Sequence, residues 1–404
     1  MQDQINIRFS PPDITEEEIN EVCDALRSGW ITTGPRTKEF ERNLADYCQT
    51  GRAVCLNSQT ACAEMALRLL GIGPGDEVIT SAYTYTASAS VICHVGATPV
   101  LVDTRKDSVE MDYDRLEAAI TERTKAIIPV DIAGVPCEYD TIFDIVEQKR
   151  RFFRPNGDIQ RALGRVVVSA DAAHALGAEY HGKKVGSVAD FTSFSFHAVK
   201  NLTTAEGGAL MWRPVPGVDD ETIYHRLQLL SLHGQSKDAI TKTKLGQWEY
   251  DIAGTWYKCN MTDISAAIGL AQLRRYPGLL ARRRELVEKY DRSLKPAGIQ
   301  VMEHLAPDRL SSCHLYITRV PGADSGLRSY IITEMAKKGI ACNVHYKPLP
   351  LLTAYRELGF DISDYPNAHD FFRNEITLPL HTLLTDEEAD YVTRCYLEII
   401  GSCV

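Results

Sequence analysis

VVVSADAAHALGAEYHGKKVGSVADFTSFSFHAVKNLTTAEGGAL, residues 166–210, is the stretch that decides the fold. Its first residues, Val166–Val168, are β-branched and apolar, which is typical of a strand buried on both faces of a sheet. Asp171 follows shortly afterwards. A carboxylate at the carboxyl end of a buried parallel strand lies where α/β sheets bind their ligands. The stretch therefore predicts a parallel sheet with a ligand site at one edge.

A second strand is predicted at residues 191–197, where polar and aromatic residues alternate. Phe194 and Phe196 would point to one face, and the intervening serines to the other. Lys200 comes directly after this strand, and the glycine pair Gly207–Gly208 follows it.

Four residues of this stretch together suggest a site for pyridoxal phosphate (PLP): Asp171, His174, Ser195 and Lys200. PLP needs an amine that holds its aldehyde as a Schiff base, and Lys200 can supply one. It also needs an anion against its pyridine nitrogen, and Asp171 is the candidate. A single lysine beyond a strand is usually a solvated charge. The prediction therefore rests on the ordered set and not on one residue.

The segments DAAHALGA (171–178) and SFSFHAVKNLTTAEGGAL (193–210) are similar to the PLP-dependent nucleotide-sugar aminotransferases of the DegT/DnrJ/EryC1/StrS family. The resemblance runs from about residue 13 to residue 395. It implies an aspartate-aminotransferase-like α/β fold (fold type I PLP enzyme), with a mostly parallel seven-stranded sheet in a large domain at residues 1–250. A smaller C-terminal α+β domain would follow at 251–404. The alternation of strands and helices up to about residue 215 favours the same sheet independently.

The length, net charge and cysteine content of the chain argue against several classes of protein. The chain has 404 residues, enough for two domains, and a formal net charge of -10, which argues weakly against polyanion binding. Eleven Cys without a CxxC pair indicate neither a zinc site nor a disulfide framework. The sequence has no apolar signal core and no run long enough to span a membrane. We therefore expect a cytoplasmic protein without a nucleic-acid or membrane partner and without a metal.

The turn NSQT after a predicted strand at Ala53–Leu56 leads into a helix, whose N-terminus is a natural phosphate site. A plain helix cap is the alternative interpretation. The family has a similar loop, NSGTxAL, and Gln59 here replaces its glycine. The resemblance implies that Thr60 and the backbone of Ala61 contact the phosphate of PLP, together with Ser195.

The resemblance gives roles to three further residues near the cofactor. Tyr85 would lay its ring flat on the pyridinium, although a tyrosine can also simply fill core space. Lys258 and Asn260 would reach the cofactor phosphate of the other subunit of a homodimer. Because a helix is predicted from about Thr262, a helix start explains Asn260 equally well.

Substrate contacts are expected from two other segments. Trp30 and Thr32 belong to SGWITTGP, which is a turn when taken alone but lies near the active site in the family. His345 and Tyr346 belong to NVHYKPL, and a core histidine on a strand is the alternative for His345.

The resemblance implies a ping-pong transamination in which L-glutamate donates an amino group to a keto sugar attached to a nucleoside diphosphate. Related dehydrating enzymes carry a histidine where Lys200 stands. SFHAVKNLTTAEGG is closer to the pattern of C4-aminating members than to PGKNLGAxGDGG, the pattern of C3-aminating ones. We therefore expect a 4-keto, 6-deoxy sugar and a 4-amino product for a surface polysaccharide, glycan or antibiotic. The alternatives are a 3-keto nucleotide sugar, a cyclitol, or a non-catalytic regulator that binds PLP or a sugar nucleotide.

Outside the site, the pattern predicts a loop-rich crossing at 215–255, a separate helix at 284–294 and strands near 313–319 and 340–346. Helices are also predicted at 13–28 and 386–398. The basic cluster at 150–162 is interpreted as a surface insertion, with a nucleotide-binding role as the less favoured alternative.

Overall fold

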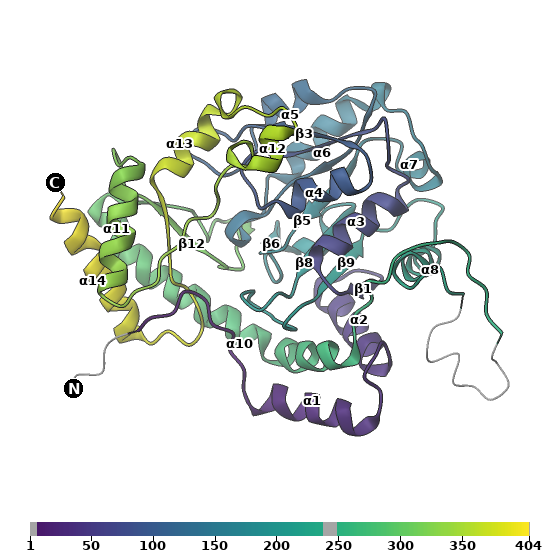
Figure 1. Cartoon of the computed structure of the whole chain (residues 1–404), viewed down its shortest axis with the longest axis horizontal. Helices are drawn as coiled ribbons and strands as arrows, with labels where there is room; N and C mark the ends of the chain where they lie inside the picture. Colours follow the sequence, from purple (N-terminus) through teal and green to yellow (C-terminus); the bar gives the residue numbers. More distant parts are fainter. Residues whose placement is uncertain (1–5, 237–248, 404) are drawn as a thin grey trace.

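The centre of the computed structural model is a seven-stranded sheet of order β1-β9-β8-β5-β4-β2-β3 (Figure 1). Strands β8, β5, β4, β2 and β3 run parallel, whereas β9 is antiparallel to both of its neighbours. The structure describes residues 6–236 and 249–403. The strands are β1 Ala53–Leu56, β2 Glu77–Ser81, β3 Thr98–Val102, β4 Thr124–Ile128, β5 Val167–Asp171, β8 Phe191–Ser195 and β9 Gly208–Trp212. The predicted seven-stranded, mostly parallel sheet is confirmed.

Both faces of this sheet are buried. In β5, Val167 belongs to one hydrophobic cluster and Val168 to another, because successive side chains of a strand point to opposite faces. The helices in the first cluster are α3 Gln59–Leu69, α4 Ala87–His94, α7 Asp158–Leu163 and α8 Asp220–Ser231. The helices that contribute to the hydrophobic clusters on the opposite face of the sheet include α2 Pro35–Cys48, α5 Tyr113–Ala119 and α6 Tyr139–Gln148.

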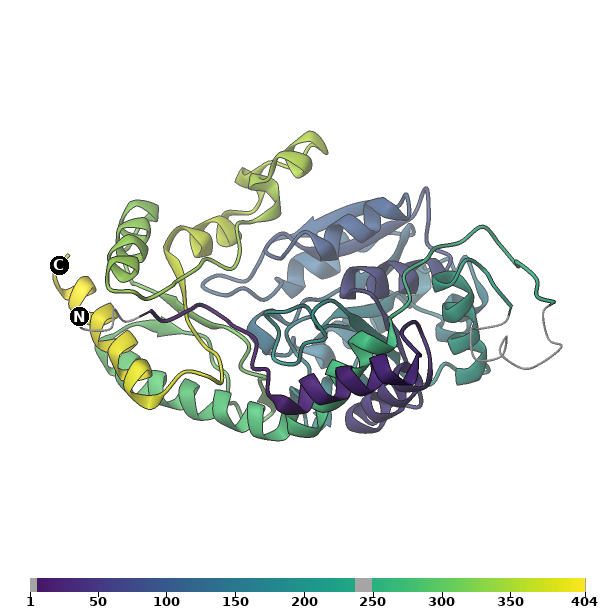
Figure 2. The same ribbon diagram turned by 60° about the horizontal axis from the view of Figure 1, so that its bottom comes forward.

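Helix α10, Asp263–Leu294, runs from the large sheet to the C-terminal part of the chain (Figure 2). The prediction of a separate helix at 284–294 was wrong, because α10 continues through Pro277. A proline inside a helix removes one hydrogen bond, but buried residues on both sides hold the helix together. Before Pro277, Leu270 packs in a cluster of the large sheet, and after it, Leu286 packs in the C-terminal core.

Helix α1, Glu16–Ser28, packs along α10. Thr15 caps it and forms a capping box with Glu18. The Glu18 carboxylate also accepts hydrogen bonds from Gln272 and Arg275 of α10, at 3.0 and 2.8 Å. These contacts tie the N-terminal helix to the long helix.

The C-terminal part contains a three-stranded antiparallel sheet of β10 Gln300–Val301, β12 Tyr316–Arg319 and β13 Glu375–Leu378. Its helices include α11 Ser325–Lys337, α12 Thr353–Glu357, α13 Pro366–Asn374 and α14 Asp386–Gly401. A third, small sheet joins β6 Glu179–Tyr180, β7 Lys183–Lys184 and β11 Arg309–Leu310. The domain boundary at residue 250 remains a prediction.

The strand expected at 340–346 is not formed, because its backbone makes only isolated bridges, from Ile340 to Ile7 and from Asn343 to Thr377. The prediction of a loop-rich crossing at 215–255 was wrong in part, because this segment contains α8, which Asp219 caps. Residues 237–248 of the segment lie outside the described residues.

The segment 150–162 is only partly a surface insertion. Arg150 and Arg151 are exposed, but Ile159 and Gln160 are buried. The Gln160 amide donates to the Leu70 carbonyl at 2.7 Å, so the second half of the segment is part of the packed large domain.

Asp263, at the start of α10, holds the loop that leads into α2. Its buried carboxylate accepts hydrogen bonds from the backbone N–H of Gly34, Arg36 and Thr37 and from the Thr37 hydroxyl, at 2.7 to 3.1 Å. Asp263→Ala leaves these donors without their acceptor, and we expect it to lower the free energy of unfolding by about 3 kcal/mol. Urea denaturation measures the loss. Asp263→Asn keeps one acceptor oxygen and should lose less, and equal losses for the two variants would contradict this explanation.

Candidate active site

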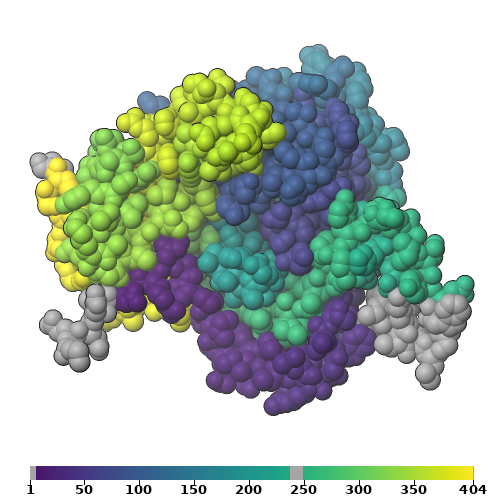
Figure 3. Space-filling view, viewed as in Figure 1, coloured from purple at the N-terminus to yellow at the C-terminus, as the bar shows by residue number. Residues whose placement is uncertain are grey.

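Polar side chains gather where the carboxyl ends of several strands meet. Tyr85 follows β2, Asp171 ends β5, and Lys200 follows β8. They line a cavity of about 310 Å³, and seven of the residues expected from the sequence are among its lining: Thr60, Tyr85, Asp171, His174, Ser195, Lys200 and Tyr346. In the space-filling view the teal surface at about residue 200 lies between the purple N-terminal segment and the blue residues above it (Figure 3).

Asp171 is a buried carboxylate with several hydrogen-bond donors. Its side chain is buried to 4% exposure and accepts from the Ser88 hydroxyl at 2.7 Å and from the Ala173 N–H at 3.1 Å. Burial raises the pKa of Asp171, and hydrogen bonds and the charge of Lys200 oppose that rise. A carboxylate held in this way suits a cationic partner.

Lys200 lies in the turn after β8, where its N–H donates to the His197 carbonyl at 2.9 Å. Burial of the amine lowers its pKa to about 8, against the opposing charge of Asp171. About a tenth of this amine is therefore neutral at pH 7, and a nucleophile or a general base must be neutral to act.

His174 is held in one tautomer. Its Nδ1 accepts from the Ala133 N–H at 3.2 Å, and its Nε2 lies 3.1 Å from the Tyr346 hydroxyl. Burial lowers the pKa of His174 well below its usual range, so the ring is neutral. Because Nδ1 accepts, Nε2 carries the hydrogen and donates it to Tyr346. His174 therefore connects the large sheet to a residue of the C-terminal part.

The residues predicted to contact the phosphate are also near the cavity. Thr60 and Ser195 line it, and the Ser195 hydroxyl accepts from the His197 N–H at 3.3 Å. The Ala61 N–H donates to the Ser58 hydroxyl at 3.0 Å, so in this structure that amide has a helix-cap partner.

Trp30 and Thr32, which were predicted to contact the substrate, lie in the loop before α2. Thr32 is exposed, and its carbonyl accepts from the Asp263 N–H at 3.0 Å. Trp30 is half-buried next to Gly34. Neither lines the cavity within this chain.

His345 lies beside the cavity and not in its wall. Its N–H donates to the buried Glu375 carboxyl at 2.9 Å, and its Nδ1 lies 3.0 Å from the Thr377 hydroxyl. The neighbouring Tyr346 ring is 5.8 Å from that of Tyr85, whose side chain is 61% exposed. The two tyrosines therefore form an aromatic wall at the mouth of the cavity.

Lys258 and Asn260 are outside the cavity lining. The exposed Lys258 ammonium donates to the Asn260 carbonyl oxygen, and the Asn260 amide donates to the Thr33 hydroxyl at 2.5 Å. The structure thus brings this pair together but does not bring it to the cavity of its own chain.

Sequence reasoning missed three residues that act on the site: Gln59, Ser88 and Asp131. Ser88 lies within α4, where nothing in the pattern marks it. Asp131 ends a strand-like run just as Asp171 does, and the same argument from strand ends could have found it. The Asp131 N–H donates to the Asp171 carbonyl at 3.1 Å.

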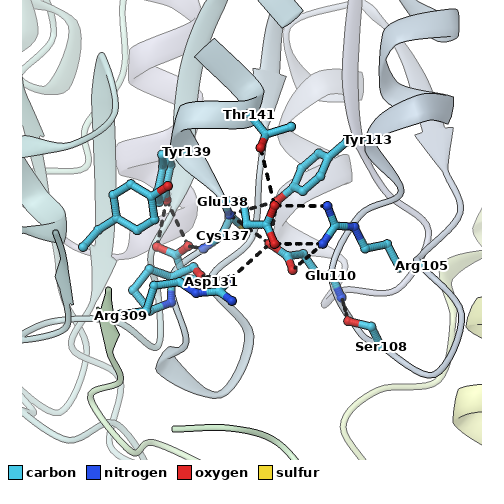
Figure 4. Close-up of polar contacts among 12 residues, drawn as sticks. Arg105, Ser108, Glu110, Tyr113, Asp131, Cys137, Glu138, Tyr139, Thr141 and Arg309 are labelled. Carbon is cyan, nitrogen blue, oxygen red and sulfur yellow. Dashed lines mark hydrogen bonds and ion pairs between the residues drawn. The ribbon is translucent and has the colours of Figure 1, made fainter. Parts of the chain in front are cut away.

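Asp131 lines the cavity and belongs to a buried hydrogen-bond network that extends away from it. Figure 4 shows the Tyr139 hydroxyl aimed at its carboxylate, 2.9 Å from each oxygen, while the Cys137 N–H donates to it at 2.9 Å. Nearby, Arg105 donates two hydrogen bonds to Glu138, at 2.9 and 3.1 Å. This network fixes the backbone that follows β4.

Burial raises the pKa of Asp131 to about 7. The folded chain therefore keeps this proton between about pH 4 and pH 7, where the unfolded chain has lost it, so the contribution of Asp131 lowers stability as pH rises through that range. Asp131→Asn should remove this contribution, which is about 1.4 kcal/mol per pH unit. Denaturation of both proteins from pH 4.5 to 8 measures it. An unchanged pH slope in the variant would contradict the protonated state of Asp131.

Among residues 6–236 and 249–403 there is no cluster of three or more His, Cys, Asp or Glu side chains arranged to hold a metal ion. No helix within these ranges is long and apolar enough to cross a membrane.

Comparison with known proteins shows which family this chain resembles. The sequence model of the DegT/DnrJ/EryC1/StrS aminotransferase family matches residues 12–396. The spore coat polysaccharide biosynthesis protein SpsC of Bacillus subtilis is 36% identical over 97% of this chain and 96% of its own length.

Solved structures of two proteins are similar to nearly the whole chain. A provisionally assigned sugar aminotransferase, Spr1654 from Streptococcus pneumoniae, in its PMP form, has 60% identity and a TM-score of 0.97, covering 99% of this chain and 100% of its own. Its PLP form has a TM-score of 0.95. Helicobacter pylori PseC, an aminotransferase involved in the biosynthesis of pseudoaminic acid, has 30% identity and a TM-score of 0.85, covering 98% of this chain and 100% of its own.

Proposed function

Because the chain belongs to the DegT/DnrJ/EryC1/StrS aminotransferase family, we propose that it is a PLP-dependent enzyme that transfers an amino group from L-glutamate to a nucleotide-linked 4-keto sugar. The observation that carries the proposal is the shared cavity of Lys200 and Asp171. The relatives named for polysaccharide and pseudoaminic acid biosynthesis support a sugar substrate.

The residues of the cavity fit PLP. An amine of lowered pKa, Lys200, suits the aldehyde, and a buried carboxylate, Asp171, suits the protonated pyridine nitrogen. Thr60 and Ser195 are hydroxyls suited to the phosphate, and Tyr85 offers a ring for stacking. When bound, PLP supplies an electron sink for the carbanion formed at the donor's α-carbon.

The chain's own residues then orient substrates and move protons. Lys200 Nζ would take the proton from the α-carbon of glutamate and deliver it to the C4′ carbon of the cofactor. In the second half-reaction it would carry a proton from that carbon to the sugar carbon that gains the amine. His174, which is neutral and accepts from the Ala133 N–H, would lie against the ring of bound PLP. Tyr346 and Tyr85 line the mouth of the cavity.

The choice of a 4-keto sugar rests on the segment SFHAVKNLTTAEGG and is tested with paired substrates. Purified protein is incubated with glutamate and either a 3-keto or a 4-keto 6-deoxy nucleotide sugar, and the aminated product is identified by mass spectrometry and NMR. We expect amination of the 4-keto compound. Amination of only the 3-keto compound would reject the assignment of the carbon, and a cofactor spectrum that glutamate leaves unchanged would reject the transaminase itself.

We also propose a homodimer in which Lys258 and Asn260 reach the cofactor phosphate of the partner subunit. The exposure of Lys258 and the distance of this pair from the cavity lining of its own chain support the proposal. Analytical ultracentrifugation tests the dimer. Mixed dimers of a Lys200→Ala chain with a Lys258→Ala, Asn260→Ala chain test whether the sites are shared.

A further inference from the structure

Gln59 is a buried polar side chain that the proposed chemistry does not use. It is the first residue of α3, it is only 5% exposed, and it lines the cavity together with Asp171. Burying an amide costs free energy unless its hydrogen bonds are satisfied. Its position in the wall of the site therefore calls for a specific partner.

The first partner of Gln59 is Ser193. The Gln59 Nε2 donates to the Ser193 hydroxyl at 3.0 Å, and that hydroxyl donates onward to the Ala170 carbonyl at 3.1 Å. Because the hydroxyl hydrogen is used on Ala170, the oxygen can only accept from Gln59. This arrangement fixes which end of the amide is NH₂.

Asp171 lines the same cavity as this amide. Ser193 is paired with Asp171 in the parallel register of β8 and β5, so an amide oriented by Ser193 lies beside the carboxylate. An NH₂ group has two hydrogens, and Ser193 takes one of them. Burial is the largest influence on the pKa of Asp171 and raises it, whereas a hydrogen bond from Gln59 acts in the lowering direction, as do those from Ser88 and Ala173.

The backbone around Gln59 is fixed by a close approach. A Cβ at Gly208 would lie 2.5 Å from the Gln59 backbone nitrogen, so β9 packs directly against the start of α3. The start of α3 therefore cannot move toward β9, and this keeps the Gln59 backbone beside the cavity.

We propose that Gln59 is a positioning residue for Asp171, and that its amide, oriented by Ser193, holds the carboxylate against the pyridine nitrogen of bound PLP. The inference rests on the proposed function, since it concerns the same cofactor. It gives a role to the residue that replaces the glycine of the similar family loop.

The test compares Gln59→Met with the wild-type protein in two measurements on the purified chain. The first is the dissociation constant of PLP for the apoprotein. The second is the ¹⁵N chemical shift of the pyridine nitrogen of labelled PLP, followed from pH 6 to 9. We expect about tenfold weaker PLP binding and loss of the ring proton at lower pH, because Asp171 is then held less firmly against the pyridine nitrogen.

Gln160→Met is the matched control. Gln160 is also a buried glutamine in the large domain, with its amide on the Leu70 carbonyl, but it does not line the cavity. The Gln160→Met substitution should lower the free energy of unfolding without changing the dissociation constant of PLP or the ¹⁵N shift of its pyridine nitrogen. Ser193→Ala should shift both in the same direction as Gln59→Met, by a smaller amount.

The outcomes separate this inference from the proposed function. If the wild-type protein does not bind PLP, the proposed function fails. If it binds PLP, and Gln59→Met folds with the wild-type affinity and the wild-type pyridine-nitrogen shift, the role of Gln59 is rejected. If Gln59→Met does not fold, Ser193→Ala decides by the same two measurements.

Discussion

Lys200→Ala is expected to abolish transamination, with a fall in rate of about a thousandfold or more. No other amine is among the residues lining the cavity within the described part of the chain. The variant therefore loses both the group that holds the aldehyde and the group that moves the proton. Stopped-flow absorbance with glutamate measures the first half-reaction, and borohydride reduction followed by peptide mapping measures the covalent attachment.

Two variants control for charge. Lys200→Arg keeps a cation but is not deprotonated near neutral pH, so it should be as inactive as Lys200→Ala. Lys337→Ala removes an exposed lysine of α11 and should be fully active. Borohydride labelling at another lysine, or wild-type turnover in Lys200→Ala, would contradict the assignment.

Asp171→Asn is expected to lower the rate about a hundredfold, corresponding to the loss of one strong charge-assisted hydrogen bond. The amide is nearly the same size as the carboxylate, but it does not stabilise a protonated pyridine nitrogen. The bound cofactor then withdraws electrons poorly. Single-turnover rates with glutamate test this expectation, together with the pyridine ¹⁵N shift, which should be that of a neutral ring.

A purely structural role for Asp171 would give a different pattern. Its loss would then lower the unfolding midpoint and leave the ring nitrogen protonated in the molecules that remain folded. Asp171→Glu keeps the charge on a longer side chain and should recover part of the rate. A rate for Asp171→Asn equal to that of the wild type would reject its pairing with the ring.

The sequence predicted the sheet and its site because both depend on short-range patterns. The strand at Val167–Asp171 is a run of buried residues ending in an acid, and Lys200 is placed by the turn after the next strand. The carboxyl ends of parallel strands meet at one edge, so these residues come together once the sheet forms.

Other features depend on contacts that no local pattern records. The segment 340–346 has the composition of a strand, yet its neighbours in space leave it only isolated bridges. Ser88 is one of the two serines of α4, and only the packing of α4 against the sheet brings it to Asp171. Pro277 suggests an end to a helix, but burial on both sides continues α10 through it.

A helix of 32 residues is about 48 Å long at 1.5 Å per residue. Through Asp263, the first turn of α10 holds the loop that ends at Gly34, and the last turns of the helix form part of the C-terminal core. One continuous helix therefore connects the segment that carries Trp30 and Thr32 to the C-terminal core, so the position of that segment depends on the helix that also supports the other end of the molecule.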